Sequence, residues 1–300
     1  MKNTTLANCI PEPSDLIEPK AALTEYFYYC NTLCLIRQLL PLLISLQRHR
    51  GASMAFLEGG ASFEQKVTKY EAEIKHRFLR IKQLNKSFGH PIPSDQWQSI
   101  ENEYDALMSH WREDNAMANF EFHSHFIEII NKLFLQLSTP VVDYTLKCSP
   151  ADSWRTHQLL ADFTFNIAPQ LIEAMAMVRG LVTYAAVAGH IDPHLHARVK
   201  YLLQSVNQHK ENLRTILGEV HKSILSPSPH FLDSTLHEHK ITQFHQLITD
   251  EFLIKKSIDS ESHLIFDFIT DVIDAYSSSI ALGINLLQLN VDDAFSQPCS

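Results

Sequence analysis

Glycine is scarce in this sequence, with eight among 300 residues, and none of the glycine-dependent catalytic motifs occurs. There is no glycine-rich phosphate loop, no Gly-x-Ser-x-Gly turn and no Cys-x-x-Cys pair. No stretch alternates apolar and polar residues between turn residues, as a half-buried strand would. These absences argue against the common nucleotide-binding, hydrolase and dithiol folds, and we expect an all-α protein that is not an enzyme and needs no cofactor.

A basic stripe is also absent, and the formal net charge is −9. Nucleic-acid binding needs a positive surface for phosphate contacts, so we expect none. The longest apolar-looking run, 33–46, is interrupted by Arg37, Gln38 and Pro41 and is too short to span a bilayer, and no apolar signal core begins the chain. We therefore expect no membrane contact.

Cysteine is too sparse for a disulfide framework. The five cysteines are odd in number and widely spaced, and Cys30 and Cys34 are only one helical turn apart. Such a set is typical of reduced thiols, which indicates a cytoplasmic protein.

Helical periodicity and turn residues divide what is present into a loose leader and two four-helix groups. The leader is residues 1–17, the first four-helix bundle is 18–148 and the second is 149–300. The expected bundle helices are 20–58, 62–88, 94–111, 120–146, 169–189, 193–217, 231–254 and 261–289, and 154–165 is expected to be a short helical link.

An arginine interrupts the apolar stripe of the first helix. Leu39, Leu43, Leu46, Arg50 and Leu57 follow one another at spacings of three, four or seven residues, so Arg50 stands where a core leucine belongs. Gly51 follows it inside the helix, where glycine costs roughly 1 kcal/mol relative to alanine. Both residues therefore need a physical reason.

The same interruption recurs in the second group. Arg179-Gly180 lies on a stripe with Ile172, Met175 and Val182, in the register of the first copy. Five of the eight glycines lie in these two segments. We interpret the pair as a weak internal repeat that sends one arginine inward from each group.

The segment Leu-Gln-Arg-His-Arg-Gly-Ala-Ser at 46–53 resembles the NIT family, the nitrate- and nitrite-sensing domain of bacterial regulators. Arg179-Gly180 resembles the second arginine-bearing helix of that family. At the level of architecture the resemblance covers roughly residues 30–290, but only these two motifs are specific. It implies two four-helix bundles that hold a nitrate or nitrite ion between arginines from different helices.

The resemblance also implies a set of site residues and partners. Arg50 and Arg179 are the principal candidates, and the lesser ones are Gly51, Ser53, Gly180, His49, His237 and Lys240. His49 departs from the family, where an acidic residue is frequent. Family members usually carry an output module, for which we expect no room here, so the output would belong to a separate protein partner. A homodimer is one assembly that the sequence allows.

Each candidate also has a structural interpretation. The arginines could pair with buried Asp or Glu of facing helices, and the glycines could simply permit close helix contact. In that case the chain is a helical scaffold or protein-interaction module with purely structural core arginines. Arg48 falls on another face of the helix, and we expect it to be solvated.

Two histidine-containing clusters resemble metal sites. Asp192 with His190, His194 and His196 has suitable spacing, yet Asp192 is explained as a helix N-cap. Glu73-x-x-His76 has the spacing of a di-iron bundle but lacks the second copy that such a site needs. We predict no metal site.

Overall fold

The computed structural model describes residues 17–149, 153–223, 234–255, 258 and 260–296, and every regular element in those ranges is helical. The predicted all-α fold is confirmed. The predicted leader, residues 1–17, lies outside the described residues except for Ile17, where the first helix begins. The first four helices are α1 (Ile17–Leu57), α2 (Glu64–Ser87), α3 (Ser94–His110) and α4 (Ala116–Cys148).

The later helices follow the predicted order with two local changes of winding. They are α5 (Trp154–Ala161), α6 (Ala168–Ala188), α7 (Pro193–Ser223), α8 (Ser234–Leu247) and α9 (Ser262–Ser296). The π-helical segment Asp162–Ile167 joins α5 to α6, and a second one, Ile248–Lys255, continues α8.

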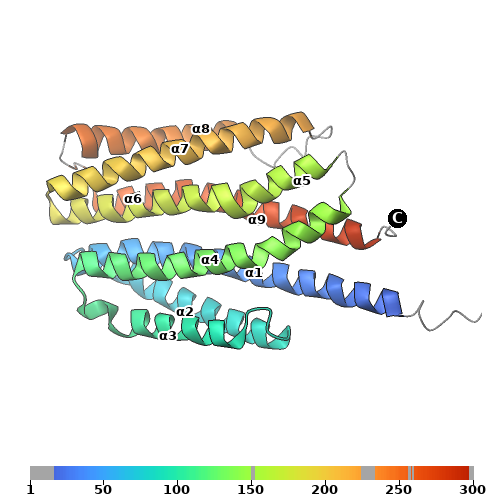
Figure 1. Ribbon diagram of the computed structural model, residues 1–300. Helices are drawn as coiled ribbons and strands as arrows, with labels where there is room; N and C mark the ends of the chain where they lie inside the picture. Colours follow the sequence, from blue (N-terminus) through green and yellow to red (C-terminus); the bar gives the residue numbers. More distant parts are fainter. Residues whose placement is uncertain (1–16, 150–152, 224–233, 256–257, 259, 297–300) are drawn as a thin grey trace, which may run out of the picture.

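The helices lie side by side in two groups, with α1 to α4 below and α5 to α9 above in Figure 1. Contacts cross between the groups along their length, because α1 packs on both α6 and α9, and α4 also meets α9. The boundary predicted at residue 148 stays a prediction, since the two groups share this continuous seam.

Helix α6 lies at the centre because its sequence has almost no polar face. Glu173 and Arg179 are its only charged residues, and apolar side chains on most of its circumference are buried. A helix that is apolar all round is one that other elements surround. Its neighbours are α1, α7 and α9.

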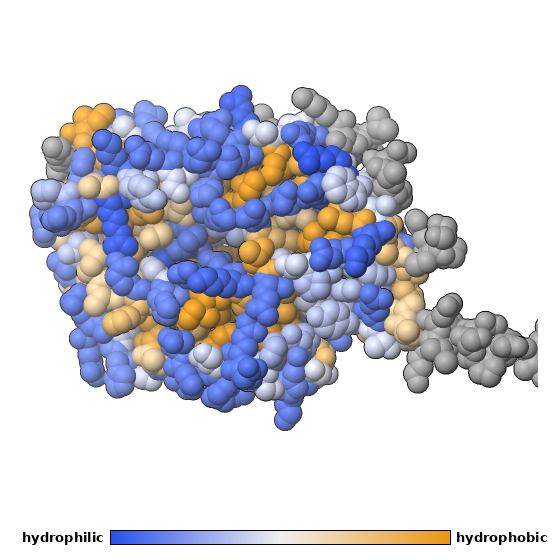
Figure 2. Space-filling view, in the orientation of Figure 1, coloured by the Kyte–Doolittle hydropathy of each residue, from blue (hydrophilic) through white to orange (hydrophobic). Residues whose placement is uncertain are grey.

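Three described stretches are long and apolar enough, by length and composition, to cross a membrane: Ala21–Leu57, Trp154–Ala188 and Ser262–Ser296. Considering only the interrupted run at 33–46 therefore underestimated how long and apolar these helices are. About half to two thirds of each apolar window is buried inside the protein (56%, 67% and 50%). The visible face in Figure 2 is mainly hydrophilic with separate apolar patches. The absence of membrane contact stays a prediction.

Candidate functional site

Helices α1 and α6 touch backbone to backbone where Gly51 faces Gly180. A Cβ atom on Gly51 would lie 3.5 Å from Cα of Gly180, and one on Gly180 would lie 3.6 Å from Cα of Gly51. Each added Cβ would also lie 3.1 Å from an aromatic ring, Phe266 for Gly51 and Phe120 for Gly180. Close helix contact is thus a sufficient reason for both glycines, and it brings the neighbouring arginines to one place.

Arg50 is fully buried and is paired at one end of its guanidinium. Its Nη1 atom donates to Oε1 of Glu173 at 2.6 Å and to Oγ of Ser124 at 3.0 Å. The other oxygen of Glu173 accepts a hydrogen bond of 2.8 Å from Nε2 of Gln47. The guanidinium also lies over the Phe120 ring, 5.0 Å from its centroid. The structural ion pair considered from the sequence therefore exists at Arg50.

The opposite edge of the same guanidinium is unused. Nε and Nη2 of Arg50 are buried and have no hydrogen-bond partner among the described residues. These two nitrogens share one edge of the planar group, the edge that can meet two oxygens of a planar anion at once. A buried donor without an acceptor costs about 1–3 kcal/mol, and more when it is charged. Arg50 thus keeps a two-donor edge inside the protein.

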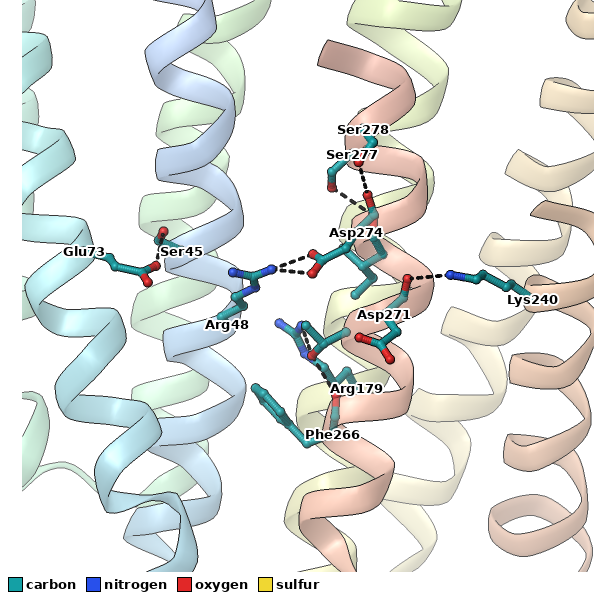
Figure 3. A network of polar contacts seen from close by, with 12 residues as sticks. Ser45, Arg48, Glu73, Arg179, Lys240, Phe266, Asp271, Asp274, Ser277 and Ser278 are labelled. Carbon is teal, nitrogen blue, oxygen red and sulfur yellow. Dashed lines mark hydrogen bonds and ion pairs between the residues drawn. The ribbon is translucent and has the colours of Figure 1, made fainter. Parts of the chain in front are cut away.

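Arg179 is also fully buried, and none of the described carboxylates forms an ion pair with it. Its Nη2 donates to the backbone carbonyl of Gln47 at 2.7 Å, and its Nη1 donates to Oγ1 of Thr270 at 2.9 Å. The guanidinium stacks 4.7 Å from the centre of the Phe266 ring (Figure 3). Its Nε has no partner among the described residues. Arg179 therefore connects α6 to α1 and α9 and retains one free donor.

The buried seam carries more positive than negative charge. Burial, and next the charge of Arg50, lower the pKa of Arg179 to about 9, so that Arg179 remains a cation at neutral pH. Among the described residues, Glu173 pairs with Arg50 and no carboxylate pairs with Arg179. An unmatched charge in a dry interior is unfavourable, and a bound anion would relieve it.

A third cation, Arg48, does not add to this excess of positive charge. It forms two hydrogen bonds of 2.7 and 2.6 Å with the carboxylate of Asp274 on α9 (Figure 3). Its side chain is only 22% exposed. The expectation of a solvated Arg48 was wrong, because α9 covers that face of α1.

Two grooves run outside the seam between α4 and α6. They have volumes of about 360 and 400 Å³, and Glu173 and Met177 line both. Ser124 lines the larger one. The Glu173 side chain is 20% exposed while that of Arg50 is 0% exposed. Glu173 and Ser124, the partners of Arg50, therefore lie between its guanidinium and the grooves.

The side chains of His49 and Ser53 form hydrogen bonds with residues of α4 and none with the unused donors of Arg50 and Arg179. Nδ1 of His49 lies 2.7 Å from Nε2 of His123, and Nδ1 of His123 lies 2.8 Å from the carbonyl oxygen of Asn119. Because a carbonyl only accepts, each ring carries its proton on Nδ1. The Ser53 hydroxyl donates to Oδ1 of Asn119 at 2.7 Å. Burial lowers the pKa of both histidines, that of His123 to about 4, so both are neutral at pH 7.

The later-helix candidates are not joined to the arginine pair by any described contact. Lys240 lies on the other side of α9 from Arg48, with its Nζ 3.4 Å from the backbone oxygen of Asp271 (Figure 3). The side chain of His237 lies outside the described residues. Neither residue adds a described contact to the site.

Sequence reasoning missed the residues that surround the arginines. These are Gln47, Ser124, Glu173, Thr270 and the two rings that stack on the guanidiniums. One signal was available, because Glu173 is the only acidic residue in α6. Ser124 and Thr270 lie on helices far away in sequence, and nothing local distinguishes them.

Asp192 is an N-cap, as predicted. Its Oδ1 accepts hydrogen bonds from the backbone N–H groups of His194 at 2.8 Å and Leu195 at 2.9 Å. Among the described residues, no three His, Cys, Asp or Glu side chains gather as metal ligands would.

Comparison with known proteins gives a fold and no family. No protein-family model and no curated protein matches the chain. A solved structure of the NasR transcription antiterminator superposes with a TM-score of 0.65 over 96% of this chain and 76% of that one. This chain shares the NasR fold. The two sequences are 16% identical, so the likeness extends to the fold alone.

Proposed function

We propose that this protein is a sensor that binds nitrate or nitrite between its two helical groups through Arg50 and Arg179. Binding would rearrange the groups and signal to a separate protein partner that regulates nitrate- or nitrite-responsive processes. The proposal includes a cytoplasmic location, no enzymatic activity and no cofactor, as the sequence predicts.

The observation that carries this proposal is the set of unused donors on two buried cations. Nε and Nη2 of Arg50 and Nε of Arg179 have no partner among the described residues, where Arg50 pairs with Glu173 and no ion pair involves Arg179. Nitrate is a planar anion whose oxygens suit the guanidinium fork, whereas a lysine would supply charge without that geometry. Each candidate ion also carries the single negative charge that the seam lacks.

The similar fold of a transcription antiterminator and the two NIT-like motifs support a regulatory role. Arg179 bonds to α1 and α9 from its position on α6, so an anion on it would act on three helices at once. A ligand shifts such an equilibrium only through its different affinity for the two arrangements. An affinity ratio of about 100 corresponds to roughly 2.7 kcal/mol, enough to switch a balanced pair of states.

A helical scaffold with structural arginines is the second candidate. The Arg50–Glu173 ion pair and the close contact of Gly51 with Gly180 favour it, because both occur without a ligand. In this alternative, the remaining donors would stay unused and the chain would respond to no anion.

Thermal melting with millimolar nitrate, nitrite, chlorate or sulfate separates the two candidates. A ligand that binds only the native state stabilises it by about 2.7 kcal/mol at 100 times its dissociation constant, and the melting temperature should rise. Arg50→Lys and Arg179→Lys should each remove most of the nitrate response, because the planar fork is lost.

Arg37→Lys is the matched control, since Arg37 also lies on α1 but bonds to Asn285 and Gln288 away from the site. It should keep the response. A wild-type protein that responds to none of the four anions would support the scaffold instead.

A further inference from the structure

Glu173 is the carboxylate that pairs with Arg50, and each of its two oxygens accepts a hydrogen bond. One accepts from Nη1 of Arg50 at 2.6 Å and the other from Nε2 of Gln47 at 2.8 Å. The unused donors are on the opposite edge of Arg50 and on Nε of Arg179. A ligand therefore has its own donors and does not need those that Glu173 uses.

We infer that Glu173 makes the site selective for singly charged anions and excludes doubly charged ones such as sulfate and hydrogen phosphate. This inference rests on the proposed function and names the charge class of its ligand.

Counting the charges of the seam leads to this selectivity. Arg50 and Arg179 contribute two positive charges, Glu173 contributes one negative charge, and the nearby Arg48 is matched by Asp274. A nitrate or nitrite ion brings the site to neutrality. A doubly charged anion leaves one negative charge in excess where both guanidiniums are fully buried. Such an uncompensated interior charge is unfavourable.

Glu173→Gln is the appropriate test variant, because it removes the charge and keeps the shape. The amide oxygen can still accept from Arg50. The amide nitrogen can donate to Oε1 of Gln47, which has no described partner in the wild-type protein, once the Gln47 amide turns over. The variant can therefore retain its hydrogen bonds, and circular dichroism without any anion checks that it is folded.

Dissociation constants of the whole protein for sodium nitrate and sodium sulfate are measured by calorimetry at constant ionic strength. Glu173→Gln should strengthen sulfate binding on the order of 100-fold more than nitrate binding. The reason is that the added charge of sulfate interacts with the carboxylate over about 6 Å at an effective dielectric constant of about 20.

Glu128→Gln is the matched control, because Glu128 lines the same grooves but pairs with Lys132 at 2.7 Å. It should leave the sulfate-to-nitrate ratio unchanged. If both variants shift the ratio equally, general surface charge is responsible and the inference is overturned.

The remaining outcomes separate the inference from the function on which it rests. If the wild-type protein binds nitrate and Glu173→Gln changes both affinities by one factor, the sensor proposal stands and the selectivity role is wrong. If the wild-type protein binds neither anion but Glu173→Gln binds sulfate, the exclusion by Glu173 is supported and nitrate sensing is not. Binding by neither protein overturns both.

Discussion

The buried histidine pair is the residue-level feature with the clearest consequence for stability. His49 and His123 are fully buried and hydrogen-bonded to each other, and the Nε2 atom of His49 has no described partner. A second proton on either ring would place a positive charge in the buried interior, where Arg112 and Arg50 would also repel it. The pair therefore tolerates only the neutral state.

Acidification should destabilise the fold through this pair. The pKa of His123 is about 4 in the native state and about 6.5 when unfolded, so between these values only the unfolded chain binds the proton. The free energy of unfolding should fall as the pH drops from about 6.5 to about 4. His123 alone should account for roughly 3 kcal/mol, at about 1.4 kcal/mol for each pKa unit. Urea unfolding at several pH values measures this slope.

Two glutamine variants test the assignment. His123→Gln should flatten the slope between pH 6.5 and 4, whereas His125→Gln should not, because the His125 side chain is 63% exposed. Equal slopes in both variants would show that other groups control the acid sensitivity.

At the scale of helices, a tight contact lies where α9 packs on the π-helical segment 162–167. A Cβ atom on Gly283 would lie 2.1 Å from Oγ1 of Thr164 and 3.2 Å from its Cβ. Thr164 is fully buried and β-branched, so it has little freedom to move aside. The glycine lets α9 pack directly on this segment.

Gly283→Ala should therefore lower the free energy of unfolding by about 1–3 kcal/mol, the usual cost of overpacking a core. Adding Thr164→Ala should recover most of the loss, because the second change removes the atoms in conflict. Denaturant unfolding of the single and double variants gives the two values.

Gly218→Ala is the contrasting change, since a Cβ there meets nothing within 4 Å and the residue is exposed within α7. It should raise stability by roughly 0.5–1 kcal/mol. A Gly283→Ala protein as stable as the wild type would mean that α9 can shift away from Thr164 at little cost.

For the whole molecule, the proposed signal is a movement of one helical group relative to the other. Polar links cross the seam at several points, and those of Arg179 join α6 to both α1 and α9. Helix shifts of about 1–2 Å are typical of such switches.

Spin labels at Gln98 on α3 and Gln204 on α7, in a variant with its cysteines replaced, should report a nitrate-dependent distance change between the groups. Both positions are exposed. The same labelled protein with Arg179→Ala should show no change. If nitrate binds while the distance and the hydrogen exchange across the seam stay constant, the protein binds the ion without signalling.

Local patterns were enough to predict the all-α fold, the order of the helices and the inward direction of both arginines. Arg50 and Arg179 interrupt apolar stripes whose period of about 3.6 residues depends only on neighbours along the chain. The Asp192 cap was predictable for the same reason, because its hydrogen bonds reach only two and three residues ahead.

The partners of those arginines were decided by tertiary structure. Glu173 pairs with a residue 123 positions earlier, and Thr270 meets Arg179 across 91 positions. Arg48 is covered by α9 through Asp274, 226 positions away. Which side chains meet across a seam depends on helix crossing and register, here set by the contact of Gly51 with Gly180. No periodicity within one helix contains that information, so the excess charge and the unused donors emerge only when the helices are packed.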